Sequence, residues 1–520
     1  MRAREPDRVG YVERDGVRIG YEVFGEAGPA LIFLPSWQIV HSRQWKLQAP
    51  SLARHMRVIT YDARGNGRSD RPSQAERYAH REIVADAVAV LDAVGIGQAV
   101  FAGTSMGALY GLQAAAWYPE RVRGVIAIGS VAPHVAPVEP GASPFYDVGA
   151  AGSVAAFCAE RGLSDYRAFV EYFMRAAITE PHRTKPIEDA VGWALETTPE
   201  VLALTVAARE GVTKEAFEEV CRAVRCPVLV VHGDEDGIIP YEHGVALAKL
   251  LGVGLVTLEG GGHLPSLGDP VRCNLLIREF VDGLRPAVGR APRRWSRALG
   301  RRRRALVVSS PIGLGHARRD VASVDELRAL HPELEVQWLA QHPVTAVLAE
   351  HGEHVHPASE LLACESAHIE SEAGEHDLHV FPAYRRMDEI LLANFMVFHD
   401  LATEEHFDLV VADEGWDIDY FLHENPELKR SPFAWLTDFV GWLPMPDGGA
   451  GEVALTADYN AEMIEQIARY PRMRDRSIFV GNPDDLVDDP LGPDLPSVRD
   501  WTTARSQAAS SQDSSPIHRS

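Results

Sequence analysis

The segment Gly103-Thr104-Ser105-Met106-Gly107 presents a serine in a setting where it could act as a nucleophile. It follows the apolar run 100–102 and precedes a helical stretch over 108–117. A tight turn between strand and helix would hold Ser105 in a strained backbone conformation with its hydroxyl exposed, and only small residues fit on either side. The spacing G-x-S-x-G also arises by chance, so the prediction of a nucleophile depends on partners elsewhere in the chain.

A serine hydroxyl is a weak nucleophile until a general base removes its proton, and that base must itself be oriented. Two suitable residues follow Ser105 in the chain. Asp236 lies just beyond the apolar run 227–231, and His263 just beyond the run 254–258. We therefore predict acyl transfer in which Ser105 attacks a carbonyl, His263 takes its proton and Asp236 holds the imidazole tautomer.

Each partner has an ordinary alternative interpretation. His263 could be a surface-loop histidine, and Asp236 could be a helix cap or turn residue. Asp234 competes with Asp236 for the orienting role, since it is two residues away. We favour Asp236 because a longer reach beyond the strand suits a carboxylate that must meet His263 Nδ1.

The elements expected to position these residues alternate between strands and helices. Four buried runs read as parallel strands, at residues 30–34, 58–61, 99–102 and 125–128, and the pattern returns at 227–232 and 254–258. Parallel sheets place ligands at the carboxyl ends of their strands, where the three residues lie. Between about 133 and 224 the strand signal lapses, and we predict a helical cap whose aromatic residues form either a substrate pocket or, more commonly, ordinary core.

Residues 10–285 resemble the α/β-hydrolase superfamily, in its cap-bearing branch of esterases and lactonases. Beyond the three predicted catalytic residues, the segment 61–69, Tyr-Asp-Ala-Arg-Gly-Asn-Gly-Arg-Ser, is similar to the family's D-x-R-G-x-G-x-S motif, in which Asp62, Arg64 and Ser69 would be structural. A serine nucleophile argues against the dehalogenases and epoxide hydrolases of the superfamily, which use aspartate. Hydrolysis of esters, lactones, thioesters and C–C bonds stays open.

The oxyanion hole departs from the family pattern. The Met106 N–H opens a helix and could face a developing negative charge. The second donor usually follows a His-Gly pair, whereas this chain reads Pro35-Ser36-Trp37. We assign the Trp37 backbone N–H, because a main-chain donor does not depend on the side chain it carries.

A second α/β domain is expected after a Pro-, Gly- and Arg-rich boundary at 286–304, which we interpret as a solvated basic linker. Expected strands lie at 305–310, 335–339, 379–381, 409–412 and 433–435, with helices at 324–330 and 390–401. The fold class is therefore α/β throughout, an α/β-hydrolase fold with a helical cap followed by a Rossmann-like domain over 305–485. The Ser- and Gln-rich tail 504–520 is predicted to be disordered.

Residues 309–320 again join a strand to a helix, with Gly313 and Gly315 positioned for close approach of a ligand. This domain resembles the acceptor-binding, amino-terminal half of a GT-B glycosyltransferase, in which a G-x-G-H loop carries the base that activates an acceptor hydroxyl. His316 matches that base, although a loop histidine without a catalytic role is the simpler interpretation. Too little chain follows for the donor-binding half, so the resemblance implies a domain that is inactive alone, or a truncated polypeptide.

Asp413, Glu414 and Asp417 form an acidic cluster after the expected strand 409–412. They could face the same crevice as His316. A run of charges is more often a solvated loop, and we interpret the cluster in that way.

The overall composition favours a globular protein acting on a small molecule. With 46% hydrophobic and 24% charged residues, the 520-residue chain can bury more than one core. A net charge of −23 argues against sequence-independent binding of nucleic acid. Five scattered cysteines without a CxxC pair, and no apolar leader or membrane span, predict reduced thiols and a cytoplasmic location. We expect no metal and no cofactor, with a small-molecule substrate and a sugar acceptor as candidate ligands.

Overall fold

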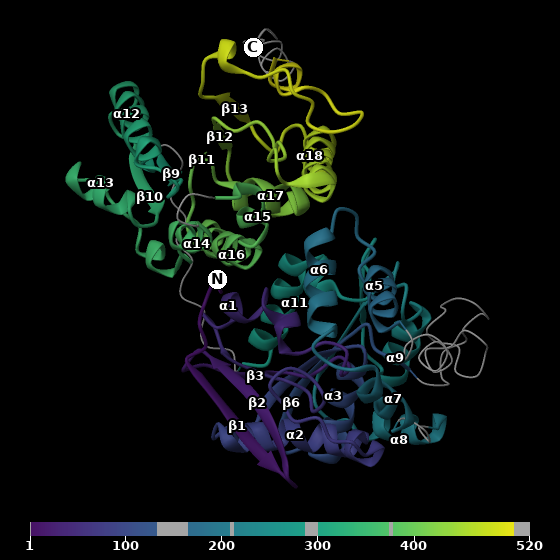
Figure 1. Ribbon diagram of the computed structural model, residues 1–520. Coiled ribbons are helices and arrows are strands. Elements are labelled where there is room, and N and C mark those ends of the chain that lie inside the picture. The colour runs from purple at the N-terminus through teal and green to yellow at the C-terminus, as the bar shows by residue number, and fades with distance from the viewer. Residues whose placement is uncertain (1, 133–164, 209–212, 286–299, 374–377, 504–520) are drawn as a thin grey trace. The chain divides into compact units, whose positions relative to one another are not determined.

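The computed structural model describes residues 2–132, 165–208, 213–285, 300–373 and 378–503 (Figure 1). The chain divides into two compact units, one over residues 4–290 and one from residue 291 onward, which also takes in residues 1–3. The division falls inside the segment 286–304, where the composition predicts a boundary. No helix in the described ranges combines the length and apolar character needed to cross a bilayer.

The first unit is built on an eight-stranded sheet in the order β1-β2-β4-β3-β5-β6-β7-β8. Strands β1, β2 and β4 pair antiparallel and the remaining pairs are parallel. The strands are β1 (Arg8–Arg14), β2 (Val17–Phe24), β3 (Ala30–Phe33), β4 (Arg57–Tyr61), β5 (Ala99–Thr104), β6 (Val122–Ile128), β7 (Val228–Gly233) and β8 (Leu255–Leu258). All six runs that the sequence predicts as strands are strands in the structure.

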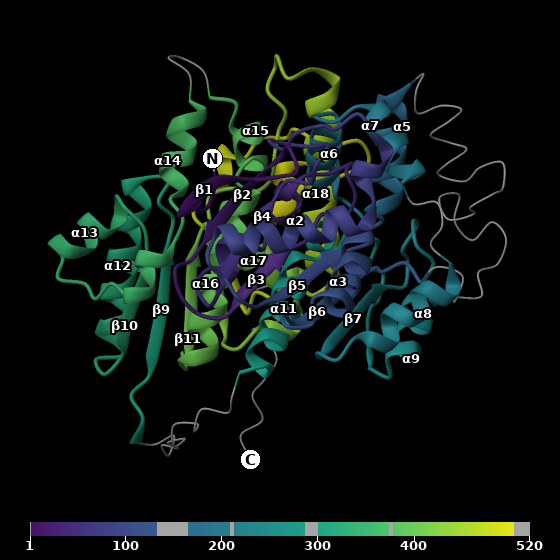
Figure 2. The same ribbon diagram turned by 90° about the horizontal axis from the view of Figure 1, so that it is seen from below.

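Helices cover both faces of this sheet because its central strands are apolar on both sides. One face packs on α1 (Ala49–Leu52) and α11 (Pro270–Gly283) through a buried cluster that includes Ile126. On the other face, α3 (Met106–Trp117) approaches so closely that a Cβ at Gly111 would lie 3.1 Å from Val125 Cγ1. Figure 2 shows α3 beside α2 (His80–Ala93) in front of the strands. Helices α9 (Glu242–Leu251) and α10 (Pro265–Gly268) also belong to this unit.

The motif 61–69 has the structural role that the sequence predicts. The Asp62 carboxylate accepts hydrogen bonds from Ser42 Oγ at 2.6 Å and from Arg68 N at 3.0 Å. Arg64 is fully buried and makes a two-point ion pair with Asp86, with both N–O distances 2.6 Å. Ser69 Oγ donates to the Asp62 main-chain oxygen at 2.7 Å. These bonds fix the loop after β4 without placing a reactive group in it.

Helices replace the strand pattern between β6 and β7, as predicted for a cap. The described helices are α5 (Tyr166–Ala177), α6 (Thr184–Ala194), α7 (Pro199–Ala207) and α8 (Lys214–Ala223). Phe169 and Phe173, which the helical spacing of aromatic residues singles out, are buried in α5. Residues 133–164 lie outside the described residues.

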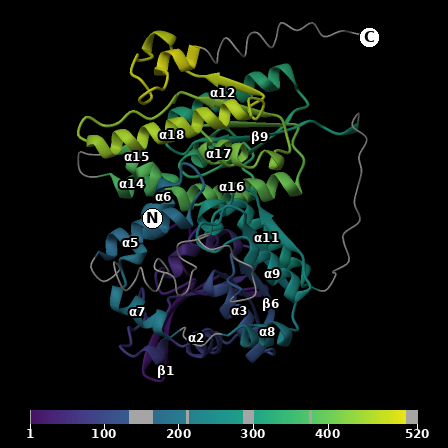
Figure 3. The ribbon, with the colours of Figure 1, turned by 90° about the vertical axis from the view of Figure 1, so that its right-hand side faces the viewer.

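The second unit contains a five-stranded, all-parallel sheet in the order β10-β9-β11-β12-β13. Its strands are β9 (Arg304–Ser309), β10 (Glu335–Ala340), β11 (Leu409–Asp413), β12 (Phe433–Thr437) and β13 (Arg476–Phe479). Its helices are α12 (Leu314–Leu330), α13 (Val344–Glu350), α14 (Glu365–Glu372), α15 (Val380–Arg385), α16 (Asp388–Glu404), α17 (Trp416–Glu424) and α18 (Gly449–Arg469). In Figure 3, α12 and α16 lie above and below β9, as in a doubly wound sheet.

Successive strands are added on one side of β9 first and then on the other side. The first crossover runs from β9 to β10, and the chain then returns to the opposite side of β9 to form β11. Outside β10, Val355 makes an isolated parallel bridge to Trp338. A full strand at that place would give the order of a Rossmann sheet. A single bridge does not make a strand, so the structure shows a second α/β domain of five parallel strands.

One of the elements predicted for this unit is wrong. Residues 379–381 are not a strand, because Val380 begins α15 and Phe381 packs on Trp442, with ring centroids 5.2 Å apart. A three-residue apolar run carries too little periodicity to separate strand from helix. In the described end of the basic segment, Arg302 and Arg303 are exposed, and Arg301 pairs with Asp408 at 2.5 Å. The other predicted strands and helices lie within observed ones, except that the predicted strand 305–310 extends one residue beyond β9, and the tail 504–520 lies outside the described residues.

Candidate active site

Ser105 occupies the turn between β5 and α3 with a strained backbone, at φ +59° and ψ −120°. The turn is tight enough to exclude side chains on both sides. A Cβ at Gly103 would lie 2.4 Å from the Gly107 carbonyl carbon, and one at Gly107 would lie 2.9 Å from Pro35 O. The structure therefore has the strand, sharp turn and helix that the pentapeptide predicts, with Ser105 at its apex.

Gly103→Ala should destabilise the first unit by about 3 kcal/mol, because the new methyl group meets main-chain atoms that cannot move without opening the turn. Thermal unfolding followed by circular dichroism would measure the loss. Gly97→Ala is the matched control, since a Cβ there meets nothing within 4 Å. Equal melting temperatures for the two variants would contradict the close approach seen at the turn.

Asp236 and His263 are joined by a hydrogen bond of 2.7 Å between Oδ2 and Nδ1. The other carboxylate oxygen of Asp236 accepts from the backbone N–H groups of Ile238 and Ile239, both at 2.8 Å. Asp234 is exposed, and its carboxylate accepts from Gly260 N at 2.7 Å. Of the two aspartates, Asp236 is thus the one bonded to the histidine.

A second buried histidine flanks Asp236. His232 Nε2 lies 3.2 Å from Asp236 Oδ2 and 3.0 Å from the main-chain oxygen of Ile239. Burial alone would raise the pKa of Asp236, but the two histidines outweigh it, so the pKa lies below its ordinary value and the carboxylate stays ionised. Sequence reasoning missed His232, whose only signal is its place at the end of β7, four residues before Asp236.

The turn after β6 brings the serine and the Asp–His pair to one edge of the sheet. Ser105 N donates to Ile128 O at 2.8 Å. The next residue, Gly129, has φ +51°, and a Cβ there would lie 3.3 Å from His263 Nδ1 and 3.4 Å from Asp236 Oδ2. Ser105, Asp236 and His263 therefore follow the carboxyl ends of β5, β7 and β8, and all three adjoin the turn formed by Ile128 and Gly129. Because Nδ1 of His263 bonds Asp236, its Nε2 is the nitrogen left to meet a hydroxyl.

The His263 loop is fixed from the side of the cap. His263 N donates to Ala177 O at 2.8 Å, and Gly262 N donates to Glu180 Oε1 at 2.9 Å. Burial raises the pKa of Glu180. Sequence reasoning missed this support, because nothing in the sequence links residues 177–180 to a loop some eighty residues later.

The loop that carries Trp37 is held beside the turn of Ser105. Asn66 Nδ2 donates to Gln38 O at 3.0 Å, and Ser36 Oγ donates to Gln44 Oε1 at 2.7 Å. The Trp37 indole donates to Thr205 Oγ1 of the cap at 2.8 Å. Met106 is the first residue of α3, where backbone N–H groups lack helical acceptors. The arrangement places both predicted oxyanion donors on segments that meet at Gly107 and Pro35.

In the second unit, His316 lies in the first turn of α12 and faces Asp413 at the end of β11. Its Nδ1 is 2.9 Å from Asp413 Oδ2, and this hydrogen bond raises the pKa of His316. Arg319 forms an ion pair with Asp413 and also reaches His316 Nδ1 at 2.8 Å. His316 is thus a half-buried member of a charged network rather than an isolated loop histidine.

The acidic cluster is not a solvated loop, which corrects the sequence-based interpretation. Asp413 is fully buried, and Glu414 and Asp417 are more than nine-tenths buried. Glu414 accepts hydrogen bonds from Asp438 N at 2.6 Å and Thr437 Oγ1 at 3.1 Å. The interpretation as a solvated loop was wrong because the run of charges lies at the carboxyl end of a central strand, where these side chains are buried. Among the described residues, no group of three His, Cys, Asp or Glu side chains has metal-binding geometry.

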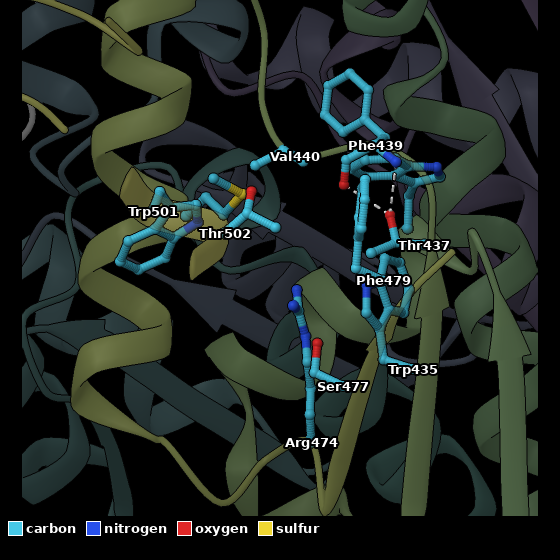
Figure 4. A pocket seen from close by; sticks show the side chains of 11 residues that line it. Trp435, Thr437, Phe439, Val440, Arg474, Ser477, Phe479, Trp501 and Thr502 are labelled. Carbon is cyan, nitrogen blue, oxygen red and sulfur yellow. Dashed lines mark hydrogen bonds between the residues drawn. The ribbon is translucent and has the colours of Figure 1, made fainter. Parts of the chain in front are cut away.

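An aromatic pocket lies at the ends of β12 and β13 (Figure 4). Trp416 packs edge-on against Trp435, with centroids 5.7 Å apart, and the Arg474 guanidinium lies 4.8 Å from the Trp435 ring centroid. Arg474 also pairs with Asp419, at 2.5 Å from Nε. Trp501 and Thr502 complete the wall.

Comparisons with known proteins concern the first unit. Residues 29–270 match the family described as alpha/beta hydrolase fold. The chain is 30% identical to 2-hydroxymuconate semialdehyde hydrolase of Pseudomonas sp. (strain CF600) over 241 residues, 46% of this chain and 80% of that protein. It is also 30% identical to the putative carbamate hydrolase RutD of Variovorax paradoxus (strain S110) over 272 residues, 50% of this chain and 95% of that protein.

A solved structure, the esterase RhEst1 from Rhodococcus sp. ECU1013, superimposes with a TM-score of 0.45 and 26% identity, covering 53% of this chain and 98% of that one. The strand–turn–helix around Ser105 and the two sequence relatives together define an enzyme of the hydrolase class. The chain belongs to the α/β-hydrolase fold family, and its first unit is the α/β-fold hydrolase.

Proposed function

We propose that the first unit is a serine hydrolase that cleaves a small ester or lactone through an acyl-enzyme on Ser105. The observation that carries this proposal is the 2.7 Å hydrogen bond between Asp236 and His263, which lies beside Gly129, the residue that follows the Ile128 acceptor of the Ser105 N–H. A carboxylate kept ionised against a histidine Nδ1 favours the tautomer whose Nε2 can accept a proton.

The geometry supports a two-step reaction. Ser105 Oγ attacks the carbonyl carbon as its proton passes to His263 Nε2, and the Met106 and Trp37 N–H groups stabilise the oxyanion. His263 then gives that proton to the departing alkoxide, leaving an acyl group on Ser105. Water attacks this acyl group with His263 again as base, which releases the acid and restores the serine.

The names of related proteins support a carbonyl substrate. Besides the two hydrolases above, 3-oxoadipate enol-lactonase 2 of Acinetobacter baylyi is 38% identical over 117 residues, 43% of its length. Bifunctional epoxide hydrolase 2 of Sus scrofa is 35% identical over 149 residues, but these cover only 26% of that protein. A serine at the apex of the turn favours acyl transfer over epoxide opening.

A substrate panel would test the class of reaction. We expect turnover of short-chain p-nitrophenyl esters or small lactones by wild type. A folded wild type that hydrolyses neither group and is not labelled by a fluorophosphonate would contradict the proposal and favour a ligand-binding sensor of hydrolase fold.

We propose as a second candidate function that the second unit recognises a glycosyl acceptor, with His316 as the base. The hydrogen bond from His316 Nδ1 to buried Asp413 favours this candidate, because it leaves Nε2 to accept a proton from a hydroxyl. The bifunctional protein would then remove or transfer an acyl group in one domain and bind a sugar acceptor in the other.

Calorimetric titration of the full-length protein with a panel of sugar acceptors tests this second candidate. His316→Ala should weaken acceptor binding about tenfold, because the substitution removes the group that would accept a hydrogen bond from the acceptor hydroxyl. His331→Ala is the matched control, since His331 lies at the far end of α12. The absence of binding by any sugar, or equal affinities for wild type and His316→Ala, would contradict the assignment.

A further inference from the structure

A buried histidine at the end of β7 shares the carboxylate of Asp236 with His263. His232 is fully buried, and its Nε2 lies 3.0 Å from the main-chain oxygen of Ile239 and 3.2 Å from Asp236 Oδ2. A carbonyl oxygen only accepts hydrogen bonds, so the proton of the neutral ring lies on Nε2. His232 is therefore a donor to Asp236, whose Oδ2 also accepts from His263 Nδ1 at 2.7 Å.

The other ring nitrogen of His232 is enclosed by the fold. Nδ1 is buried without a hydrogen-bond partner in the described part of the chain, and a Cβ at Gly244 of α9 would lie only 2.6 Å from it. A proton on Nδ1 would be a buried donor without an acceptor, which costs free energy. Burial and packing thus favour the tautomer that donates through Nε2.

His232, Asp236 and Ile239 are joined in a closed ring of hydrogen bonds. The N–H of Ile239 donates to Asp236 Oδ1 at 2.8 Å, and the carbonyl oxygen of Ile239 accepts from His232. The N–H of Ile238 donates to the same Oδ1 at 2.8 Å. Both oxygens of the carboxylate are thereby tied to β7 and the loop that follows it, which fixes the direction in which Oδ2 meets His263.

Two further titratable side chains lie beside His232. The ring of Tyr241 meets the imidazole edge-on, with centroids 6.0 Å apart. His243 is the second, and burial lowers its pKa to about 4, so it is uncharged at neutral pH. The hydrogen bonds that side chains donate to Asp236 come from His232 and His263.

We propose that His232 is a positioning residue for the hydrolase reaction, which holds the Asp236 carboxylate in place and, by sharing Oδ2, limits how strongly that carboxylate stabilises a protonated His263. This inference rests on the proposed serine chemistry of the first unit. A hydrogen bond to a carboxylate stabilises its negative charge and leaves less of that charge for a second donor. His263 then stays unprotonated, and able to act as a base, to lower pH than beside an unshared carboxylate.

His232→Phe and His232→Gln test this role. Phenylalanine fills the space of the imidazole without a donor, whereas the amide of glutamine can place an N–H near the position of the imidazole Nε2. We expect His232→Phe to lower kcat about tenfold, since one hydrogen bond to a charged group is lost. The acidic limb of its kcat/KM profile should move to higher pH by about one unit. His232→Gln should restore the wild-type acidic limb.

His243→Phe is the matched control, because it makes the same change at a neighbouring buried histidine. We expect it to leave the acidic limb of kcat/KM unchanged, whatever it costs in melting temperature. This control separates an effect exerted through Asp236 from a general loosening of the core around β7 and α9.

The tautomer of His232 gives a measurement that does not depend on turnover or on the folding of a variant. In full-length protein labelled with ¹⁵N at histidine, the resonances missing from His232→Gln should show a proton on Nε2 and none on Nδ1 between pH 7 and 9. Wild type that is active and labelled by a fluorophosphonate at Ser105, with His232 protonated on Nδ1 or with an unchanged acidic limb in folded His232→Phe, would overturn the role of His232 alone. Folded wild type that is neither active nor labelled would overturn the proposed function, and this role with it.

Discussion

Ser105→Ala should lower kcat for ester hydrolysis by at least about 10⁴-fold. The substitution removes the atom that forms the acyl-enzyme and leaves water as the only nucleophile. Alanine keeps the turn between β5 and α3, because its Cβ occupies the same strained position as that of serine at φ +59°. Steady-state kinetics on the best ester of the panel would measure the loss.

The control for Ser105→Ala is the folded state of the variant. We expect an unchanged melting temperature. A variant that remains folded and keeps more than a tenth of the wild-type kcat would show that another group attacks the substrate.

Asp236→Asn should lower kcat by about 10⁴-fold, even though the side chain keeps its shape. An asparagine can still accept from Ile238 N and Ile239 N, but it turns an NH₂ group toward His263 Nδ1. The histidine must then present Nδ1 as an acceptor, so the proton moves to Nε2, the nitrogen required to be the base. The same change removes the negative charge that stabilises the imidazolium form.

Asp234→Asn is the matched control, because Asp234 lies two residues away and its carboxylate accepts a hydrogen bond from Gly260 N rather than from His263. We expect its kcat to stay within about twofold of wild type, as an exposed carboxylate contributes little. Measuring both variants across pH 5–9 separates lost base function from a shifted optimum. Equal losses in the two variants would contradict the role given to Asp236.

The sequence predicts the catalytic unit well because its signals are local. The turn at Ser105 follows from two glycines flanking a serine between an apolar run and a helix. Asp236 and His263 follow from their places just beyond apolar runs, since all parallel strands of one sheet end at the same edge. The sequence favours Asp236 over Asp234 only because Asp236 lies farther beyond the strand. In the structure, Asp236 is the aspartate that is hydrogen-bonded to His263.

What the sequence does not predict depends on contacts between distant segments. The support of the His263 loop by Ala177 and Glu180 joins residues some eighty positions apart. The burial of Asp417 depends on α14 and α16, whose residues Glu365 and Asn394 line the same pocket. A local run of charges gives no sign of these distant helices. The prediction of a strand at 379–381 is wrong for a related reason. A short apolar run is compatible with both strand and helix, and here Phe381 packs on Trp442 within a helix.

The central claim is that Ser105 forms the covalent intermediate, and an adduct mapped by mass spectrometry tests it most directly. The protein is incubated with a fluorophosphonate, digested, and its peptides are searched for the added phosphonyl mass. We predict a single modified residue, Ser105, and no adduct in Ser105→Ala or after prior incubation with a turned-over ester. An adduct on another serine, or none on folded wild type, would contradict the account.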